Sequence, residues 1–400
     1  MKTVALAFRY LWSRPLAALL NLLLLTLGLA SITFVVLVGE QVGRAFERDL
    51  AGIDVVVGAK GSPMQLILSG VFHIDVPAGN IALSDVRELE KSPAVRKLIP
   101  LSLGDAFRGF RIVGTTPEYL RHYRMRVASG SEWTKTMEAV VGADVARTLG
   151  FKAGDAFVGN HGLGGMGDAH GNHPYRISGV LAPCGCVVDR LIVTSTESVW
   201  QVHEKEMAMD EDDRKALEEA REITVALISY RTPLAAVTFP RYVNTQTEMQ
   251  AAAPAIEITR LLRMLGVGSE VLQGIGAVLL LSAALSVFVA LWNAVRERRA
   301  DLAMLRMLGA TPAKVAALLL CEALWLAVLA SILGLLAGHA LTSLVGSLLQ
   351  AQGSLPISGW HWLPEETWIP ALAMAVAAAA ALIPAASAYR TDVAHLLNSR

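Results

Sequence analysis

Three of the nine histidines and one aspartate gather in the Gly-rich segment "GNHGLGGMGDAHGNHPY", residues 159–175. Imidazole and carboxylate groups bind Zn²⁺ and Cu²⁺, so this segment could hold such a metal, with the two cysteines of "PCGC" and a later histidine as further ligands if the fold brings them close. The spacing matches no defined metal motif, and a solvent-exposed loop without metal is the alternative. The candidate ligands are His161, Asp168, His170, His173, Cys184, Cys186 and His203.

The sequence does not determine the chemical state of the two cysteines of "PCGC". A disulfide is permitted on the oxidising side of a membrane, but a pair separated by a single residue makes a strained bridge. A pair of free thiols, two metal ligands or two residues without special chemistry are therefore equally compatible with the sequence. The third cysteine, Cys321, lies in a predicted membrane helix.

A second chemically distinctive segment is "NAVRERRADLAMLRMLGATPAKV", residues 293–315, where a cationic patch is followed by leucines at every third position. Gly309 is a typical residue just past a helix end, Thr311 can cap the next helix, and Pro312 suits the first position of that helix. We call residues 296–314 the elbow. The residues that it would present to a partner are Arg296, Arg298, Arg299, Leu302, Leu305, Arg306, Leu308, Gly309, Thr311, Pro312 and Lys314.

The elbow lies between long apolar segments that are predicted to cross a membrane. Four stretches carry no charged residue, namely Leu16–Gly39, Val271–Val295, Ala323–Gly338 and Trp368–Ala388. About 20 apolar residues are enough for a helix to cross the hydrocarbon core. We therefore predict one N-terminal and three C-terminal transmembrane helices. The first one is too long for the apolar core of a signal peptide, so we expect it to stay as an anchor.

Cationic loops remain in the cytoplasm, which predicts the orientation. Lys2, Arg9 and Arg14 place the N-terminus inside, and the arginines of the elbow and of the C-terminal tail lie on the same side. With four spans these assignments agree. They place a large domain and the short segment "ISGWHWLPEET" on the opposite face.

The section between the first two spans is polar enough to form an independent domain of mixed helices and strands. We expect strands in "DVVVGAKG", "RISGVLAP", "RLIVTST" and Arg221–Arg231, and a strand, a helix ending at Gly150 and a turn in residues 138–155. Residues 204–223 are expected to form a solvated helix. The predicted organisation is 1–44 for an N-terminal stub and the first span, 45–265 for the domain, and 266–400 for three spans with the elbow.

Known catalytic motifs are missing from the 400 residues. The sequence has no Gly-Lys dipeptide and therefore no P-loop, and neither H-E-x-x-H nor G-x-S-x-G occurs. The net charge is zero, which gives no indication of nucleic-acid binding. We expect no enzyme activity in this chain, and any ATP that drives it would bind to another subunit.

The elbow sequence "RERRADLAMLRMLGATPAKV" resembles the signature segment of FtsX-like permeases of ABC transporters, the superfamily that includes MacB, LolC/LolE and FtsX. The segments "IVGTTPEYLRHY", "EAVVGADVARTLGFKAGD" and "ISGVLAPCGCVVDRLIVTSTESVW" resemble the MacB periplasmic core domain and occur in the same order. The one-plus-three arrangement of spans matches as well, so the resemblance covers nearly the whole chain. Asp301-Leu302, the "PCGC" segment and the His-rich loop depart from the family pattern.

This resemblance implies a permease subunit in a bacterial inner membrane with its large domain in the periplasm. It implies no cofactor on the chain itself, ATP and magnesium on a partner ATPase that docks on the elbow, and a second permease chain, identical or paralogous. A periplasmic or outer-membrane partner is compatible with it. Motion driven by ATP would be transmitted to the periplasmic domain, which would act on an envelope substrate by export or extraction. A membrane-anchored metal-binding component that uses the His-rich loop and zinc is the alternative.

Two polar residues in the spans could line a conduction path. Glu322 is predicted near the cytoplasmic start of the third span, where its side chain could reach the interface, and His339 lies in the outer half. A helix-packing role with satisfied hydrogen bonds is the expected function of both. So few polar groups argue against ordinary conduction through the membrane.

Overall fold

The computed structural model describes residues 2–13, 15–162, 173–207, 216–297, 304–351 and 357–389. The chain separates into two compact units. The first, which we call the membrane unit, comprises Met1–Val42, Met264–Ala351 and Leu355–Arg400, and the second, the large domain, spans Gly43–Arg263. Each unit is described by itself below.

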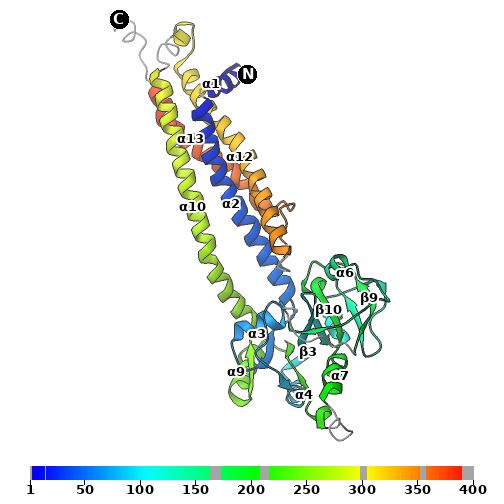
Figure 1. The fold of residues 1–400 in the computed structure, drawn as a ribbon. Coiled ribbons are helices and arrows are strands. Elements are labelled where there is room, and N and C mark those ends of the chain that lie inside the picture. The colour runs from blue at the N-terminus through cyan, green and yellow to red at the C-terminus, as the bar shows by residue number, and fades with distance from the viewer. Residues whose placement is uncertain are drawn as a thin grey trace. The chain divides into compact units, whose positions relative to one another are not determined.

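The membrane unit is built from long helices (Figure 1). Their bounds are α1 (Lys2–Leu11), α2 (Pro15–Leu50), α10 (Pro254–Glu297), α12 (Pro312–Ala351) and α13 (Trp368–Tyr389), with a 3₁₀ turn η2 (Pro364–Thr367) before the last one. Within the described residues, four segments are long and apolar enough to cross a membrane: Pro15–Leu50, Glu270–Glu297, Pro312–Leu349 and Pro364–Tyr389. The predicted arrangement of one N-terminal and three C-terminal spans is confirmed.

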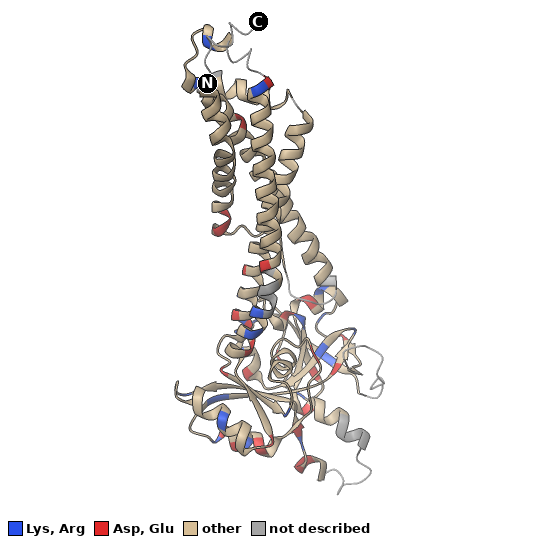
Figure 2. Cartoon of the chain, turned by 90° about the vertical axis from the view of Figure 1, so that its left-hand side faces the viewer, with Lys and Arg blue, Asp and Glu red and all other residues tan. Residues whose placement is uncertain are grey.

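Apolar packing holds this bundle together, and its outer surface is apolar too. Alanines and leucines of α2, α10, α12 and α13 form one buried cluster, while Leu281, Leu336 and Leu382 are each more than 60% exposed. Because water does not favour so much exposed leucine on long helices, these faces are suited to lipid. Figure 2 shows the middle of the long helices almost free of charged residues.

Two glycines of α12 bring it close to α2. A Cβ atom at Gly334 would lie 2.6 Å from Cβ of Leu29, and one at Gly338 would lie 2.5 Å from Cβ of Thr33. These distances are far below van der Waals contact, so only glycine permits the approach. The spacing of four residues is the small-xxx-small pattern by which membrane helices pack closely.

The large domain combines strands with short helices. Its strands are β1 (Val55–Ala59), β2 (Ile81–Ala82), β3 (Val95–Phe107), β4 (Phe110–Thr115), β5 (Val127–Gly130), β6 (Glu138–Val141), β7 (Ala156–Phe157), β8 (Asn160–His161), β9 (Tyr175–Leu181), β10 (Leu191–Ser195), β11 (Glu222–Ile223), β12 (Val225–Tyr230) and β13 (Met249–Ala252). The helices are α3 (Pro63–Gly70), α4 (Leu83–Glu90), α5 (Pro117–His122), α6 (Ala143–Leu149), α7 (Thr196–Met207) and α9 (Ala235–Gln246), with a 3₁₀ turn η1 (Val187–Arg190).

Most of the described strands join one sheet in the order β13-β1-β12-β3-β4-β10-β6-β9-β5. The pairs β4–β10 and β6–β9 are parallel and the other neighbours are antiparallel, so the sheet is mixed. Two buried apolar clusters support it, one around Phe239 of α9 and one around Phe157 and Tyr175. The predicted mixed domain of helices and strands is confirmed.

The local predictions for this domain hold with one exception. The sequence of strand, helix and turn in residues 138–155 is present, and Gly150 has the left-handed conformation that ends α6 (φ 73°). The helix expected over residues 204–223 and the strand expected over Arg221–Arg231 overlap at residues 221–223. The strand prediction is the right one there, since Glu222–Ile223 forms strand β11 and Ile223 is 1% exposed. The helix stops before its predicted end because Ile223 pairs with β2, about 140 residues away in the sequence.

Candidate functional site

The elbow contains the predicted helix break. The chain is helical at 304–307, and the amide of Ala310 donates to the carbonyl oxygen of Leu305 at 3.0 Å. Gly309 closes this end in the left-handed conformation (φ 92°). The hydroxyl of Thr311 then accepts from the amide of Lys314 at 3.3 Å, and Pro312 is the first residue of α12. The sequence therefore determines a sharp, capped turn at this end of the bundle.

The turn presents apolar side chains on its surface. Leu308 is 85% exposed and Met304 and Met307 are more than half exposed, whereas Leu305 packs against the bundle core. The predicted leucine stripe is therefore divided: one leucine stabilises the elbow and the next projects from it. Among the predicted basic residues, Arg296 and Lys314 are exposed and Arg306 is partly buried. Arg298, Arg299 and Leu302 lie outside the described residues.

A groove of about 430 Å³ runs beside the turn. One wall comes from the elbow and the start of α12, and the other comes from α1. Its lining residues are Thr3, Leu6, Leu305, Leu308, Gly309, Ala310, Lys314, Val315 and Leu318. The groove is apolar apart from Thr3 and Lys314, and it opens on the face that carries Leu308.

The contribution of α1 was missed by reasoning from the sequence. Its carbonyl oxygen at Val4 accepts from the indole Nε1 of Trp325 at 3.1 Å, and the rings of Phe8 and Trp325 meet edge to face at 5.2 Å. These contacts fix α1 against α12. Its strongly amphipathic sequence "KTVALAFRYL" was the available signal.

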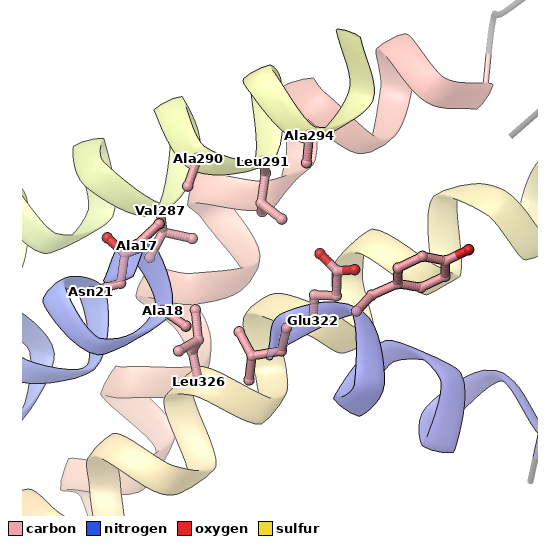
Figure 3. Close-up of a pocket in the computed structure, with 11 residues that line it drawn as sticks. Ala17, Ala18, Asn21, Val287, Ala290, Leu291, Ala294, Glu322 and Leu326 are labelled. Carbon is pink, nitrogen blue, oxygen red and sulfur yellow. The ribbon is translucent and has the colours of Figure 1, made fainter. Parts of the chain in front are cut away.

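A small cavity with a mostly apolar lining lies in the bundle, where α1, α2, α10 and α12 meet (Figure 3). Its volume is about 40 Å³, enough for water. Glu322 and Asn21 line it and are 4% and 2% exposed, and Oδ1 of Asn21 has no hydrogen-bond partner among the described residues. Glu322 is therefore buried and does not extend to the surface. It has an interaction partner, which agrees with the packing role expected for it. Ala290 and Ala294 line the same cavity.

His339, the other polar residue of the spans, is satisfied by hydrogen bonds. Its Nε2 lies 2.7 Å from a carboxylate oxygen of Glu366, and its Nδ1 lies 2.6 Å from the carbonyl oxygen of Gly359. These contacts bind the segment before α13 to α12. The packing role expected for this histidine is the one observed.

The candidate metal ligands are placed only in part. Asp168 and His170, and the side chains of His161 and His203, lie outside the described residues. His173 is partly buried. In the part of the chain that the structure describes, no three His, Cys, Asp or Glu side chains form a group that could hold a metal ion. The metal hypothesis therefore stays a prediction about the His-rich loop.

The two cysteines of the candidate set form a disulfide, Cys184–Cys186, with Cα atoms 5.1 Å apart. In this state neither sulfur is a thiolate that could bind a metal. The carboxylate of Asp189 accepts from the amides of Cys184 and Gly185 at 3.0 and 2.6 Å and so fixes the loop. Burial raises the pKa of Asp189, and these two amides oppose the rise.

Comparison with known proteins adds evidence for the family. Residues 18–237 match the model of the MacB-like periplasmic core domain, which covers more than half of the chain, and residues 274–393 match the model of the FtsX-like permease C-terminal region. The chain is 25% identical over 199 residues to the pyoverdine export ATP-binding/permease protein PvdT of Pseudomonas putida. That match covers 46% of this chain and 28% of the relative, so the chain spans well under half of its length.

The matches to solved structures have low sequence identity and low TM-scores. The periplasmic region of MacB from Actinobacillus actinomycetemcomitans is 10% identical with a TM-score of 0.35, covering 54% of this chain and 95% of that one. The extracellular domain of the ABC-type transporter YknZ from Gram-positive bacteria is 10% identical with a TM-score of 0.31, covering 49% and 98%. The matched family models, in chain order and in the expected segments, carry the assignment: this chain belongs to the MacB-like and FtsX-like family of ABC transporter permeases, as a multi-pass membrane protein with a periplasmic-type domain.

Proposed function

We propose that this permease transmits the motion of a separate ATPase to its large domain, which acts on an envelope substrate by export or extraction. The observation that supports it most is the elbow: a capped turn with an apolar residue, Leu308, that is 85% exposed beside a groove. A leucine so exposed at the end of a membrane helix is suited to a protein partner with a complementary cleft.

The mechanical part of the proposal depends on how the elbow is attached. α10 is one unbroken helix from Pro254 to Glu297, and Leu305 ties the elbow to the bundle core. Displacement of the elbow would therefore move α10 and α12 together.

We assign ATP binding to a partner ATPase subunit; these 400 residues contain no P-loop motif. A second permease chain, identical or paralogous, would complete the complex, and a periplasmic or outer-membrane partner is compatible with it. We place the complex in the bacterial inner membrane with the large domain in the periplasm. The name of the Pseudomonas relative refers to pyoverdine export and to ATP binding, which agrees with an export role without naming a substrate for this chain.

The proposal requires the elbow and the large domain to lie on opposite sides of the membrane. Single cysteines at Leu308 and Glu248, in a Cys321→Ser background, report the two sides; the side chain of Glu248 is 96% exposed. In spheroplasts, a membrane-impermeant maleimide is expected to label Glu248→Cys directly and Leu308→Cys only after permeabilisation. Labelling of both positions in intact spheroplasts would refute the proposed function.

A further inference from the structure

The segment between α12 and α13 carries two exposed tryptophans. Trp360 is 91% exposed and Trp362 is 64% exposed, and His361 between them is exposed as well. Large aromatic side chains are rarely exposed to this extent in water without a binding partner. The segment belongs to the membrane unit and lies at the end of the bundle opposite to the elbow, since α12 separates the two along the chain.

Hydrogen bonds hold this segment in a fixed conformation. The side-chain amide of Gln41 in α2 donates to the carbonyl oxygen of Ser358 at 2.9 Å and accepts from the amide of Ser358 at 2.9 Å. His339 bonds to Gly359 and to Glu366, and the second carboxylate oxygen of Glu366 accepts from the amide of Leu363. The base of the segment is therefore fastened to two membrane helices.

Close packing reinforces these bonds. A Cβ atom at Gly359 would collide with the carbonyl oxygen of His339, and one at Gly346 would collide with that of Ile357. Ile357 and Leu363, on either side of the tryptophans, are 8% and 6% exposed. The buried residues on both sides fix the backbone that carries the two tryptophans, and the ring of Trp362 lies 5.0 Å from that of His339, which leaves Trp360 as the more exposed of the two.

The position and the composition of the segment indicate what kind of partner it binds. α13 begins at Trp368, directly after the segment, and its 22 residues are about the length that crosses the hydrocarbon core, so the segment is expected near the edge of that core. Residues 357–364 contain no Lys, Arg, Asp or Glu. Tryptophan, with an apolar ring and one N–H donor, concentrates at the boundary between lipid headgroups and acyl chains.

We propose that Trp360, His361 and Trp362 form a lipid-binding surface that inserts into the headgroup region of the outer leaflet. This surface anchors the segment in the membrane, and through Gln41 it holds α2 one residue before the membrane unit ends at Val42. It thus fixes the point at which α2 leaves the bilayer. The proposal goes beyond the elbow and its ATPase and holds whether or not that partner exists.

The test is a depth measurement on the full chain in phosphatidylcholine and phosphatidylglycerol vesicles. A nitroxide is attached at Trp360→Cys in a Cys321→Ser background, and its collision rates with oxygen and with a water-soluble nickel chelate are measured. Two reference positions are labelled in the same way. Leu281 on α10 is 72% exposed, so Leu281→Cys reports the hydrocarbon core. Glu248→Cys reports water, because the side chain of Glu248 is 96% exposed.

At position 360 we expect the ratio of the oxygen collision rate to the nickel-chelate collision rate to lie between the ratios at the two reference positions. Such a value is expected at the boundary of the headgroup region. A ratio equal to that of Glu248→Cys would mean that the tryptophan is in water and would overturn the proposal. Protection from both reagents would mean that protein covers the site and would overturn it too. Because Trp360 is almost fully exposed, the substitution leaves the fold intact, and the chain's melting temperature verifies this.

Discussion

Replacing Leu308 by glutamate is expected to weaken binding of the partner ATPase by at least about 20-fold. The side chain of Leu308 lines the groove at the elbow and is 85% exposed, and an apolar anchor at the centre of an interface contributes about 2 kcal/mol or more. Since every 1.4 kcal/mol changes affinity by about tenfold, the lost anchor accounts for that factor even before the cost of burying charge. Titration of the purified permease with the purified ATPase measures the change.

A matched control separates this effect from added negative charge. Val237 is 73% exposed in the large domain, so replacing it by glutamate alters a similar apolar surface away from the elbow. This control is expected to bind the ATPase as the unchanged chain does. Equal affinity for the elbow variant and the unchanged chain would show that the ATPase does not use this groove.

Replacing His339 by leucine is expected to destabilise the membrane unit strongly, by about 3–5 kcal/mol, because it leaves the carboxylate of Glu366 without its partner. Glu366 is 2% exposed, and its remaining bond to the amide of Leu363 cannot compensate for the lost imidazole. The two ring nitrogens of His339 lie 2.6 and 2.7 Å from oxygen atoms of Gly359 and Glu366, and leucine forms neither hydrogen bond. The loss is measured as a lower melting temperature in detergent.

Two further variants make this prediction specific. His361→Leu is the same substitution at an exposed position of the same segment and should leave the melting temperature nearly unchanged. Adding Glu366→Met to His339→Leu removes the unpaired charge and should recover much of the stability. If His339→Leu melts like His361→Leu, the His339–Glu366 pair contributes little to the fold.

The features that could be predicted from the sequence are those that residues close together in the chain determine. The four spans follow from length and apolarity, and the turn at Gly309 and Thr311 follows from the conformations and hydrogen bonds that those residue types favour. The first strand and the unit of strand, helix and turn that begins at Glu138 were predictable for the same reason.

Contacts between distant parts of the chain were not predictable in this way. The groove joins Leu6 to residues about 300 positions later, and the pair of His339 and Glu366 depends on how the intervening segment returns to α12. The spacing of residues in a single sequence does not show that the segment before α13 packs back against α12. The order of strands in the sheet depends likewise on pairing between remote segments, and Ile223 lay in both a predicted helix and a predicted strand because its partner strand was unknown.

The central claim is that the elbow is bound by an ATPase on the side of the membrane opposite to the large domain. A photo-crosslinking amino acid in place of Leu308 tests it most directly, with the same amino acid in place of Val237 of the large domain as the reference. The account predicts that, in living cells, position 308 crosslinks to a protein that contains a P-loop and binds ATP, and that position 237 does not. Crosslinks from position 308 only to lipid or to proteins without a nucleotide site, or an ATPase crosslinked from position 237, would contradict the account.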